Sequence, residues 1–425
     1  MTASLSLPSY YQATANRKIS TTPLMGDVKA DVCVIGAGYT GLSAALELAQ
    51  AGFKVVVLEA EAIGFGASGR NGGQICTGFS SGQGKIEAQL GKADAKRAFG
   101  LAEEAKQLIV DRAAKHKIDC DIRWGYLHCI PKAHQFNHLQ EWHDEYEALG
   151  YGGNTLLTKD ELEQKLGTTI YHGALRESHA GHMHPLNYCL GLADAAIKAG
   201  AVIHEHSRVI EVSTGSSPWA RTDKGKVSAK FMIIGGNAYL GNLVKPLEGH
   251  VMPVASYIIA TEPLGEDRAK ALIADNEAVA NTNFIVDYYR RSADHRMLFG
   301  GRASYSGRTP AALGEYMRPR MTSVFPQLKD VKIDYAWGGN IAITSNRIPD
   351  CGRLSPTVYY AHGYSGQGVA LAGMYGKLMA EAVRGQAERF DLLAKIKHLP
   401  FPGGKLRTPL LVAAMAYYRI RDALS

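Results

Sequence analysis

The segment from Asp31 to Glu59, DVCVIGAGYTGLSAALELAQAGFKVVVLE, constrains the fold of this chain most strongly. It has the order of a strand, a glycine turn, a helix and a second strand that closes on an acid. Gly36 permits a tight turn, Gly38 leaves room for a pyrophosphate at the backbone, and Gly41 lets the helix pack closely on the sheet. The segment therefore predicts a dinucleotide-binding unit in which Glu59 accepts hydrogen bonds from an adenosine ribose.

Two features favour FAD over NAD as the dinucleotide. The spacing of Gly41, Gly52 and Glu59, with the apolar residues between them, matches the long flavoprotein signature. The loop Gly64 to Gln74, GFGASGRNGGQ, then follows the acid directly, where it could run along an extended FAD. A flexible linker is the alternative, but this loop sets one Arg and one Asn between glycine pairs, as a loop that approaches a cofactor closely would.

Composition excludes several other classes of protein. A chain of 425 residues, 46% hydrophobic and 20% charged, is an ordinary globular protein of two domains. The 47 Lys and Arg residues exceed the 40 Asp and Glu residues only modestly, and no basic run with interleaved aromatics suggests nucleic acid. The six cysteines form no C-x-x-C pair, and no segment resembles a signal peptide or a membrane span. We therefore expect a cytoplasmic protein that binds neither nucleic acid nor membrane, with a homo-oligomer left open.

The remaining segments predict two interleaved domains. The strand before Gly235-Gly236 and the strand, turn and helix of 358–385 return to the first domain, whereas the aromatic strands at 254–262, 283–291 and 296–303 predict an antiparallel sheet. We expect an α/β fold in which a Rossmann-like FAD-binding domain is interleaved with an α+β substrate domain built on that sheet. The expected boundaries are 27–84, 180–245 and 338–400 for the FAD-binding domain, 85–179 and 246–337 for the substrate domain, 1–26 for an N-terminal arm over the surface or a partner subunit, and 401–425 for a C-terminal extension.

Two further motifs allow competing interpretations. The turn Gly363 to Gly368 brings backbone amides to a helix start, where the positive end can stabilise negative charge on a flavin. A nucleophile elbow at Ser365 is the alternative, but the second glycine of that motif is misplaced. The histidines of ESHAGHMHP (177–185) are spaced as on one strand face but lack a further ligand in sequence, so we predict no metal site.

Blocks spread over nearly the whole chain resemble the D-amino-acid-oxidase-like superfamily of FAD-dependent amine oxidases, and in particular its members that act on gamma-glutamylated polyamines. The blocks are the Tyr10-Tyr11 pair, GAGYTGLSAAL, GFGASGRNGGQ, GHMHPLN, GNAYLG, DYYR, FPQLK, GYSGQGV, FPGG and AYYRIRDAL. The resemblance implies that the terminal primary amine of gamma-glutamylputrescine or a related polyamine is oxidised to the aldehyde, with oxygen as acceptor and with release of ammonia and hydrogen peroxide.

Other functions stay open on the sequence alone. A related dehydrogenase or oxidase could act on a D-amino or imino acid, and a flavin-binding RNA-modifying or assembly protein is a third reading. Hydride transfer from a neutral amine needs no side-chain base, so no catalytic residue is assigned.

Motifs and resemblance together indicate the residues that contact a non-covalently bound FAD. They are Gly36, Gly38, Tyr39, Thr40, Gly41, Glu59, Ala60, Gly66, Ala67, Ser68, Arg70, Asn71, Gly72, Gly73, Gln74, Val209, Gly235, Gly236, Gly338, Gly366, Gln367, Gly368 and Val369. The expected substrate-binding residues are Tyr257, Tyr288, Tyr289, Arg290, His362 and Tyr364. Alternation along NFIVDYYRR puts Tyr288 and Arg290 on one face, and we expect the Arg290 guanidinium to bind the substrate's alpha-carboxylate.

Overall fold

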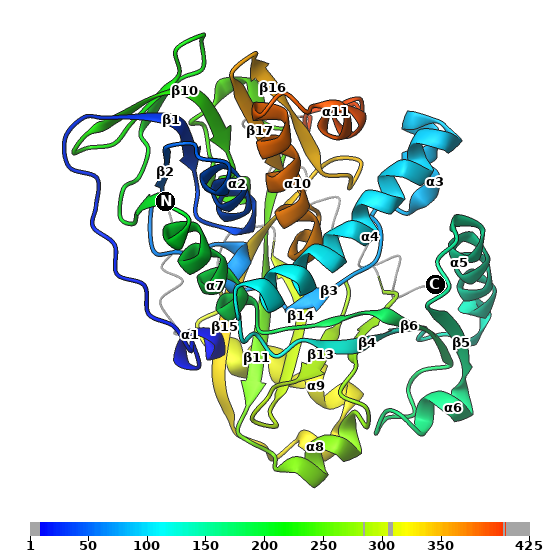
Figure 1. Ribbon diagram of the computed structural model, residues 1–425. Helices are drawn as coiled ribbons and strands as arrows, with labels where there is room; N and C mark the ends of the chain where they lie inside the picture. The colour runs from blue at the N-terminus through cyan, green and yellow to red at the C-terminus, as the bar shows by residue number, and fades with distance from the viewer. Residues whose placement is uncertain (1–8, 284, 305–308, 403, 405–425) are drawn as a thin grey trace.

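The computed structural model describes residues 9–283, 285–304, 309–402 and 404. Two sheets lie one above the other, with helices between them and beneath the second sheet (Figure 1). The first sheet has the order β16-β17-β10-β1-β2-β7, with β9 beside β10 and β8 beside β9. Its strands are β1 (Val28–Ile35), β2 (Val55–Leu58), β7 (Val202–His204), β8 (Glu211–Ser213), β9 (Trp219–Arg221), β10 (Lys226–Ile234), β16 (Asp350–Ser355) and β17 (Val358–His362).

The centre of the first sheet is parallel, as the dinucleotide motif requires. β1 pairs in parallel with both β2 and β10, and β10 pairs in parallel with β17. Val55 to Leu58 are buried, as is typical of a strand covered on both faces. The predicted Rossmann-like domain is confirmed. Strands β7 and β8 are separate and short, and the residues between them include His206 with a φ of 51°.

Helices cover the face of this sheet that points towards the second sheet (Figure 1). They are α2 (Tyr39–Gln50), α4 (Lys92–Lys115), α7 (Pro185–Lys198) and α10 (Gly368–Val383), while α3 (Gln83–Leu90) precedes α4 and α11 (Glu388–Ala394) follows α10. Helices α3 and α4 form a consecutive pair, largely within residues 85–179, which were expected to belong to the substrate domain. The pair packs on α10 rather than within the substrate domain, and Lys377 of α10 is paired with Glu104 of α4 at 2.9 Å.

The second sheet has the order β15-β11-β14-β13-β12-β4-β6-β3, with β5 beside β6. Only β12 and β4 pair in parallel, so the predicted antiparallel sheet is confirmed. Its strands are β3 (Gln74–Ile75), β4 (Arg123–Cys129), β5 (Asn154–Thr158), β6 (Gly173–His182), β11 (Met252–Thr261), β12 (Ala278–Asn281), β13 (Tyr288–Arg291), β14 (Met297–Ser304) and β15 (Ile333–Ile343). The expected domain boundary at 338 falls inside β15.

Shorter elements complete the second layer. Helices α5 (Phe136–Leu149) and α6 (Lys159–Glu163) lie beside β5 and β6, α8 (Glu266–Leu272) and α9 (Leu313–Val324) lie below the sheet, and short 3-10 helices occupy 67–69, 133–135, 237–239, 245–247 and 326–328. α6 has the expected capping box, in which Thr158 and Glu161 satisfy each other's backbone amides. No helix among the described residues is both long and apolar enough to span a bilayer.

The N-terminal arm packs against its own chain. Helix α1 (Tyr10–Ala13) buries Tyr10 and Tyr11, and the Tyr11 ring lies 5.2 Å from Trp337 and 5.0 Å from His184, centroid to centroid. The two aromatic rings fill an apolar gap between the layers, whereas residues 12–23 are exposed or half-buried and lie over the surface, as predicted. A contact of the arm with a partner subunit stays a prediction. The predicted extension 401–425 lies largely outside the described residues.

Close packing of α10 on α2 fixes the position of both helices. A Cβ at Gly376 would meet the Thr40 carbonyl oxygen and would lie 2.8 Å from the Ser43 Cβ. We expect Gly376→Ala to lower the free energy of unfolding by roughly 1–3 kcal/mol through overpacking, measured by thermal and urea unfolding. Gly100→Ala is the control, since a Cβ there meets no atom within 4 Å and an alanine should stabilise α4. Equal stability of the two variants would refute the close-packing account.

Candidate functional site

An elongated cavity of about 740 Å³ opens where the dinucleotide unit meets the second sheet. One end lies at Glu59 and Glu61, beyond β2. The cavity passes the turn Gly36–Thr40 and ends between Tyr364–Val369 and the strands β11 and β15. Such a cleft, at the carboxyl ends of parallel strands, is where doubly wound folds bind ligands.

Most of the predicted cofactor residues line this cavity, namely Gly36, Gly38, Tyr39, Thr40, Glu59, Ala60, Gly66, Ala67, Ser68, Asn71, Val209, Gly235, Gly236, Gly366, Gly368 and Val369. Gly41, Arg70, Gly72, Gly73, Gln74, Gly338 and Gln367 are not among its lining residues. Gly41 supports the site from behind, because its Cβ would collide with the Gly36 carbonyl oxygen.

The turn before α2 is shaped to receive a pyrophosphate. Gly36 has a φ of +99° and a Cβ there would lie 3.0 Å from the Gly235 carbonyl oxygen, so only glycine fits. Gly38 is the N-cap residue and offers no capping side chain, while the Ser68 Oγ accepts a hydrogen bond from the Tyr39 amide at 3.0 Å. The Ser68 Oγ therefore satisfies the Tyr39 amide, and the amides that follow it in the first turn of α2 have no capping side chain, which suits an anion.

Glu59 is held at the cavity wall by backbone amides. Its Oε2 accepts from the Ala37 amide at 2.7 Å, and its Oε1 accepts from the Glu61 amide at 3.0 Å. Burial raises the pKa of Glu59, and these backbone bonds work against that rise. Each carboxylate oxygen keeps acceptor capacity for a hydroxyl in the cavity. The residues therefore fit an adenosine ribose.

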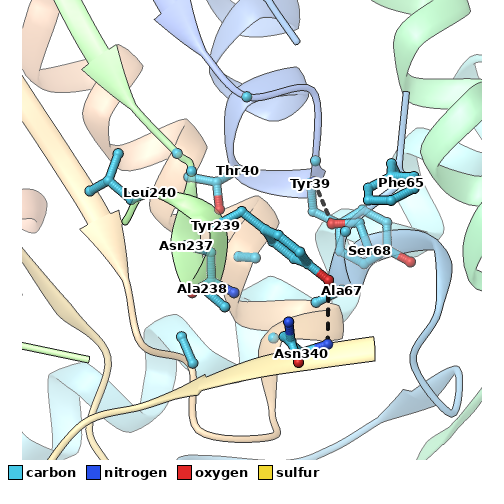
Figure 2. A pocket seen from close by; sticks show the side chains of 18 of the residues that line it. Tyr39, Thr40, Phe65, Ala67, Ser68, Asn237, Ala238, Tyr239, Leu240 and Asn340 are labelled. Carbon is cyan, nitrogen blue, oxygen red and sulfur yellow. Dashed lines mark hydrogen bonds between the residues drawn. The ribbon is translucent and has the colours of Figure 1, made fainter. Parts of the chain in front are cut away.

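Tyr239 crosses the middle of the cavity (Figure 2). Its hydroxyl accepts a hydrogen bond from the Asn340 amide of β15 at 3.4 Å, so it joins the two sheets across the site. The Asn237 Oδ1 accepts from the Gly363 amide at 3.0 Å. Neither residue was predicted from the sequence, although GNAYLG directly after Gly235 is the signal that could have identified both.

The far end of the cavity carries neutral hydroxyls. Tyr364 lines it, as predicted, and its hydroxyl lies 2.7 Å from the Thr40 Oγ1. Burial raises the pKa of Tyr239 and of Tyr364, so both phenols are protonated at neutral pH. The Gln367 Oε1 is buried without a hydrogen-bond partner among the described residues. Gln367 itself does not line the cavity, so this acceptor lies beside the site rather than in it.

Arg70 is a buried cation behind the same end of the cavity. Its Nε donates to the Phe65 carbonyl oxygen at 2.9 Å, and its guanidinium lies 5.0 Å from the Phe65 ring centroid. Only 6% of the residue is exposed, and burial lowers the pKa of the guanidinium. In the described part of the chain it forms no ion pair with a carboxylate. Such a charge can stabilise an anion that forms nearby.

The structure gives Arg290 a different role from the predicted one. Its guanidinium is 3% exposed and donates to the carbonyl oxygens of Gly72 and Met183 at 2.8 and 3.1 Å. The Tyr11 hydroxyl and the Arg291 carbonyl oxygen accept its remaining hydrogen bonds at 3.2 Å. Arg290 lies on the face of β13 that strand alternation predicted. Its N–H groups, however, already donate to backbone carbonyl oxygens and to the Tyr11 hydroxyl. The structure therefore contradicts the carboxylate-binding prediction, and Arg290 fastens the loop 72–73 to the second sheet.

Three other predicted substrate residues also belong to the interior. Tyr289 stacks on Phe299 with centroids 5.5 Å apart, and Tyr257 is packed in the same core cluster, above α9. His362 is 2% exposed and is hydrogen-bonded to Asp350 at 2.9 Å. None of the three lines the cavity. The period of a strand identified their faces but not what packs against them.

Tyr288 retains a position compatible with its predicted role. Its ring lies against the cofactor loop, since a Cβ at Gly72 would be 2.8 Å from the Tyr288 Cε2. Its hydroxyl lies 3.1 Å from the Ser256 Oγ, and the residue is half-buried. Of the two tyrosines of β13 that were predicted to bind substrate, Tyr288 faces the loop 64–74 and Tyr289 faces the core.

Comparisons with known proteins agree with this geometry. A family model described as "DAO: FAD dependent oxidoreductase" matches residues 31–382. Gamma-glutamylputrescine oxidoreductase of Escherichia coli (strain K12) is 44% identical over 418 residues, which cover 98% of each chain. The probable oxidoreductase OrdL of Haemophilus influenzae is 42% identical over 97% of each chain. The crystal structure of glycine oxidase from Geobacillus kaustophilus covers 87% of this chain and 99% of its own, with a TM-score of 0.72 and 21% identity, and shares the fold.

Removing the Glu59 carboxylate should weaken FAD binding. Each charge-assisted hydrogen bond to a ribose hydroxyl contributes about 1.5–3 kcal/mol, so we expect Glu59→Ala to bind FAD at least roughly tenfold more weakly. Flavin retained after dilution and gel filtration measures the loss. Glu87→Ala, on the exposed side of α3, is the matched control. Full flavin occupancy in Glu59→Ala would count against the ribose assignment.

Replacing Arg290 should damage the fold around the loop rather than substrate selectivity. Arg290→Met leaves the buried carbonyl oxygens of Gly72 and Met183 without donors, and we expect a loss of roughly 3 kcal/mol of stability together with faster FAD release. Thermal unfolding and flavin retention measure both effects, with the exposed Arg97→Met on α4 as control. Unchanged stability with a higher KM for carboxylate-bearing amines alone would restore the original prediction.

Proposed function

The chain belongs to the DAO family of FAD-dependent oxidoreductases, and we propose that it oxidises the terminal primary amine of gamma-glutamylputrescine or a closely related gamma-glutamylated polyamine. The products are the aldehyde, ammonia and hydrogen peroxide, with oxygen as the electron acceptor. The observation that carries the proposal is the cavity, which joins a dinucleotide cradle to the antiparallel sheet. The identity of 44% over nearly the full length to a relative of that name supports the choice of substrate.

The residues of the cavity suggest how they would serve this reaction. FAD, when bound, supplies the two-electron acceptor for amine oxidation. Glu59 and the first turn of α2 would hold its adenosine and pyrophosphate, and the start of α10 at Gly368 would favour negative charge at the opposite end. The buried Arg70 guanidinium adds a positive charge within the loop 64–74.

The substrate amine has to lose a proton before it is oxidised. Two ionisable side chains of the cavity are phenols, Tyr239 at its middle and Tyr364 at its far end, and burial raises the pKa of both, so they are donors and not bases. The amine must therefore react in its neutral form after losing its proton to water. We assign no catalytic base, and the Tyr288 ring is proposed as a wall for the aliphatic chain of the substrate.

We propose that FAD is held without a covalent bond. The lining residues of the cavity include no cysteine and no histidine, which are side chains that could form such a bond. Acid precipitation of the purified protein should leave the yellow flavin in the supernatant. Flavin that stays with the precipitated protein would contradict the proposal.

The reaction itself is tested by a substrate panel in air. We expect gamma-glutamylputrescine to drive oxygen uptake with matching formation of hydrogen peroxide and ammonia, and free putrescine to do so at lower kcat/KM. D-Alanine and sarcosine report the alternative amino or imino acid activity. Turnover of these with no response to gamma-glutamylputrescine would overturn the proposed substrate. Reduction of an artificial acceptor without peroxide would instead indicate a dehydrogenase.

We also place the protein in the cytoplasm. All six cysteines are free in the structure, which suits a reducing compartment.

A further inference from the structure

A histidine-rich cluster lies outside the cavity, where the two sheets meet behind the turn Gly363–Gly366. Asp350 opens β16 and His362 ends β17, and the two residues are direct partners in the antiparallel pairing of these strands. His250 reaches them from the segment just before β11 of the second sheet. None of the three lines the cavity, so the cluster is separate from the site described above.

One carboxylate oxygen is the centre of this cluster. The Asp350 Oδ2 lies 2.8 Å from the His250 Nδ1 and 2.9 Å from the His362 Nε2, and one ligand atom from each residue lies within 4.8 Å of the others. The Tyr360 hydroxyl donates to the Asp350 Oδ1 at 3.1 Å. Asp350 and His362 are each 2% exposed. The side chains are therefore fixed from both strands and screened from solvent.

A third imidazole lies near the same carboxylate. His398 interacts electrostatically with Asp350, His250 and His362, and both of its ring nitrogens are buried without a hydrogen-bond partner among the described residues. The His362 Nδ1 is also buried and unpartnered, but the Nε2 is the atom beside Asp350, so an ion bound there would not satisfy the Nδ1. The segment of His398 is held in place by the Phe401 amide, which donates to the Gly249 carbonyl oxygen at 2.8 Å. Buried polar atoms in native proteins almost always have a partner, so unmet imidazole nitrogens beside a carboxylate call for an explanation.

We propose that His250, Asp350 and His362 bind a divalent transition-metal ion of the zinc class. Imidazole nitrogens and one carboxylate are the ligands that such an ion takes, usually in tetrahedral geometry at about 2.0–2.2 Å. Ligand atoms around that centre are about 3.4 Å apart, so the two hydrogen-bonded distances to Asp350 need to open by about half an ångström. Each imidazole presents a lone pair to the ion, and its proton resides on the other ring nitrogen.

The position of the site suggests a structural role. His362 directly precedes the turn that lines the cavity, whereas His250 belongs to the second sheet. An ion shared by them fastens the start of β11 to the end of β17, and so keeps the turn Gly363–Gly366 in place. The Tyr360 hydroxyl orients the carboxylate that would ligate the ion, as outer-shell hydrogen bonds do at metal sites.

Metal retention by the untagged holoenzyme tests the inference. After treatment with a chelator, incubation with Zn²⁺ and desalting, elemental analysis should find about one zinc ion per chain, as a single tetrahedral site requires. Zn²⁺ should also raise the Tm, whereas Mg²⁺, which prefers oxygen ligands, should not. His250→Gln should lower zinc retention at least tenfold, and Tyr360→Phe by about 10–100-fold in affinity. FAD content checks that both variants are folded.

His138→Gln is the control, because His138 is an exposed histidine on α5 outside the cluster, and it should retain zinc like the parent protein. Retention by the parent no greater than that of His250→Gln, or no rise in Tm with Zn²⁺, would show that the cluster is only a hydrogen-bonded contact between the sheets. Zinc retention and Tm do not depend on turnover, so their outcome is independent of whether the proposed reaction is correct.

Discussion

The cavity exists because backbone segments approach one another more closely than side chains would allow. At Gly36 the chain turns against Gly235 of the neighbouring strand, and at Gly376 helix α10 touches the backbone of α2. These two contacts place the starts of α2 and α10 at the same edge of the first sheet. A dinucleotide cradle and a second helix N-terminus are thereby brought into one cavity, and both favour negative charge in the bound group.

The second sheet completes the site. Some of its residues line the cavity, and others hold the lining segments in position. Asn340 of β15 and Tyr239 meet across the cavity, while Arg290 of β13 holds the loop at Gly72 from below. The two sheets therefore depend on one another. A substitution in the antiparallel sheet can release the cofactor without touching it, which separates cofactor retention from substrate selectivity as experimental readouts.

The glycine motifs could be predicted from sequence because each residue's role depends on local backbone geometry. The turn at Gly36, the acid at Glu59 and the loop at Ser68 all lie where the motif placed them. Arg290 shows the limit of that reasoning. Strand alternation gave its face, but its acceptors, at Gly72 and Met183, are distant in sequence and appear only when the layers pack.

The same limit applies to the residues that were missed or misassigned. Tyr239 lies within the recognisable block GNAYLG, yet its contact across the cavity depends on β15, which comes a hundred residues later. His362 was expected at the substrate, but its ring is hydrogen-bonded to Asp350, its partner in the strand pairing. Pairing between strands is set by the whole fold, and no local pattern near His362 indicates it.

Anaerobic mixing of the purified flavoprotein with gamma-glutamylputrescine tests the central claim most directly, because it follows the transfer of electrons from the amine without oxygen or any later step. If the chain oxidises gamma-glutamylputrescine as proposed, the oxidised flavin spectrum is bleached in a single turnover, at a rate that saturates with substrate and exceeds the rate with free putrescine. A flavin spectrum left unchanged by gamma-glutamylputrescine, in protein that a chemical reductant still bleaches, would contradict it.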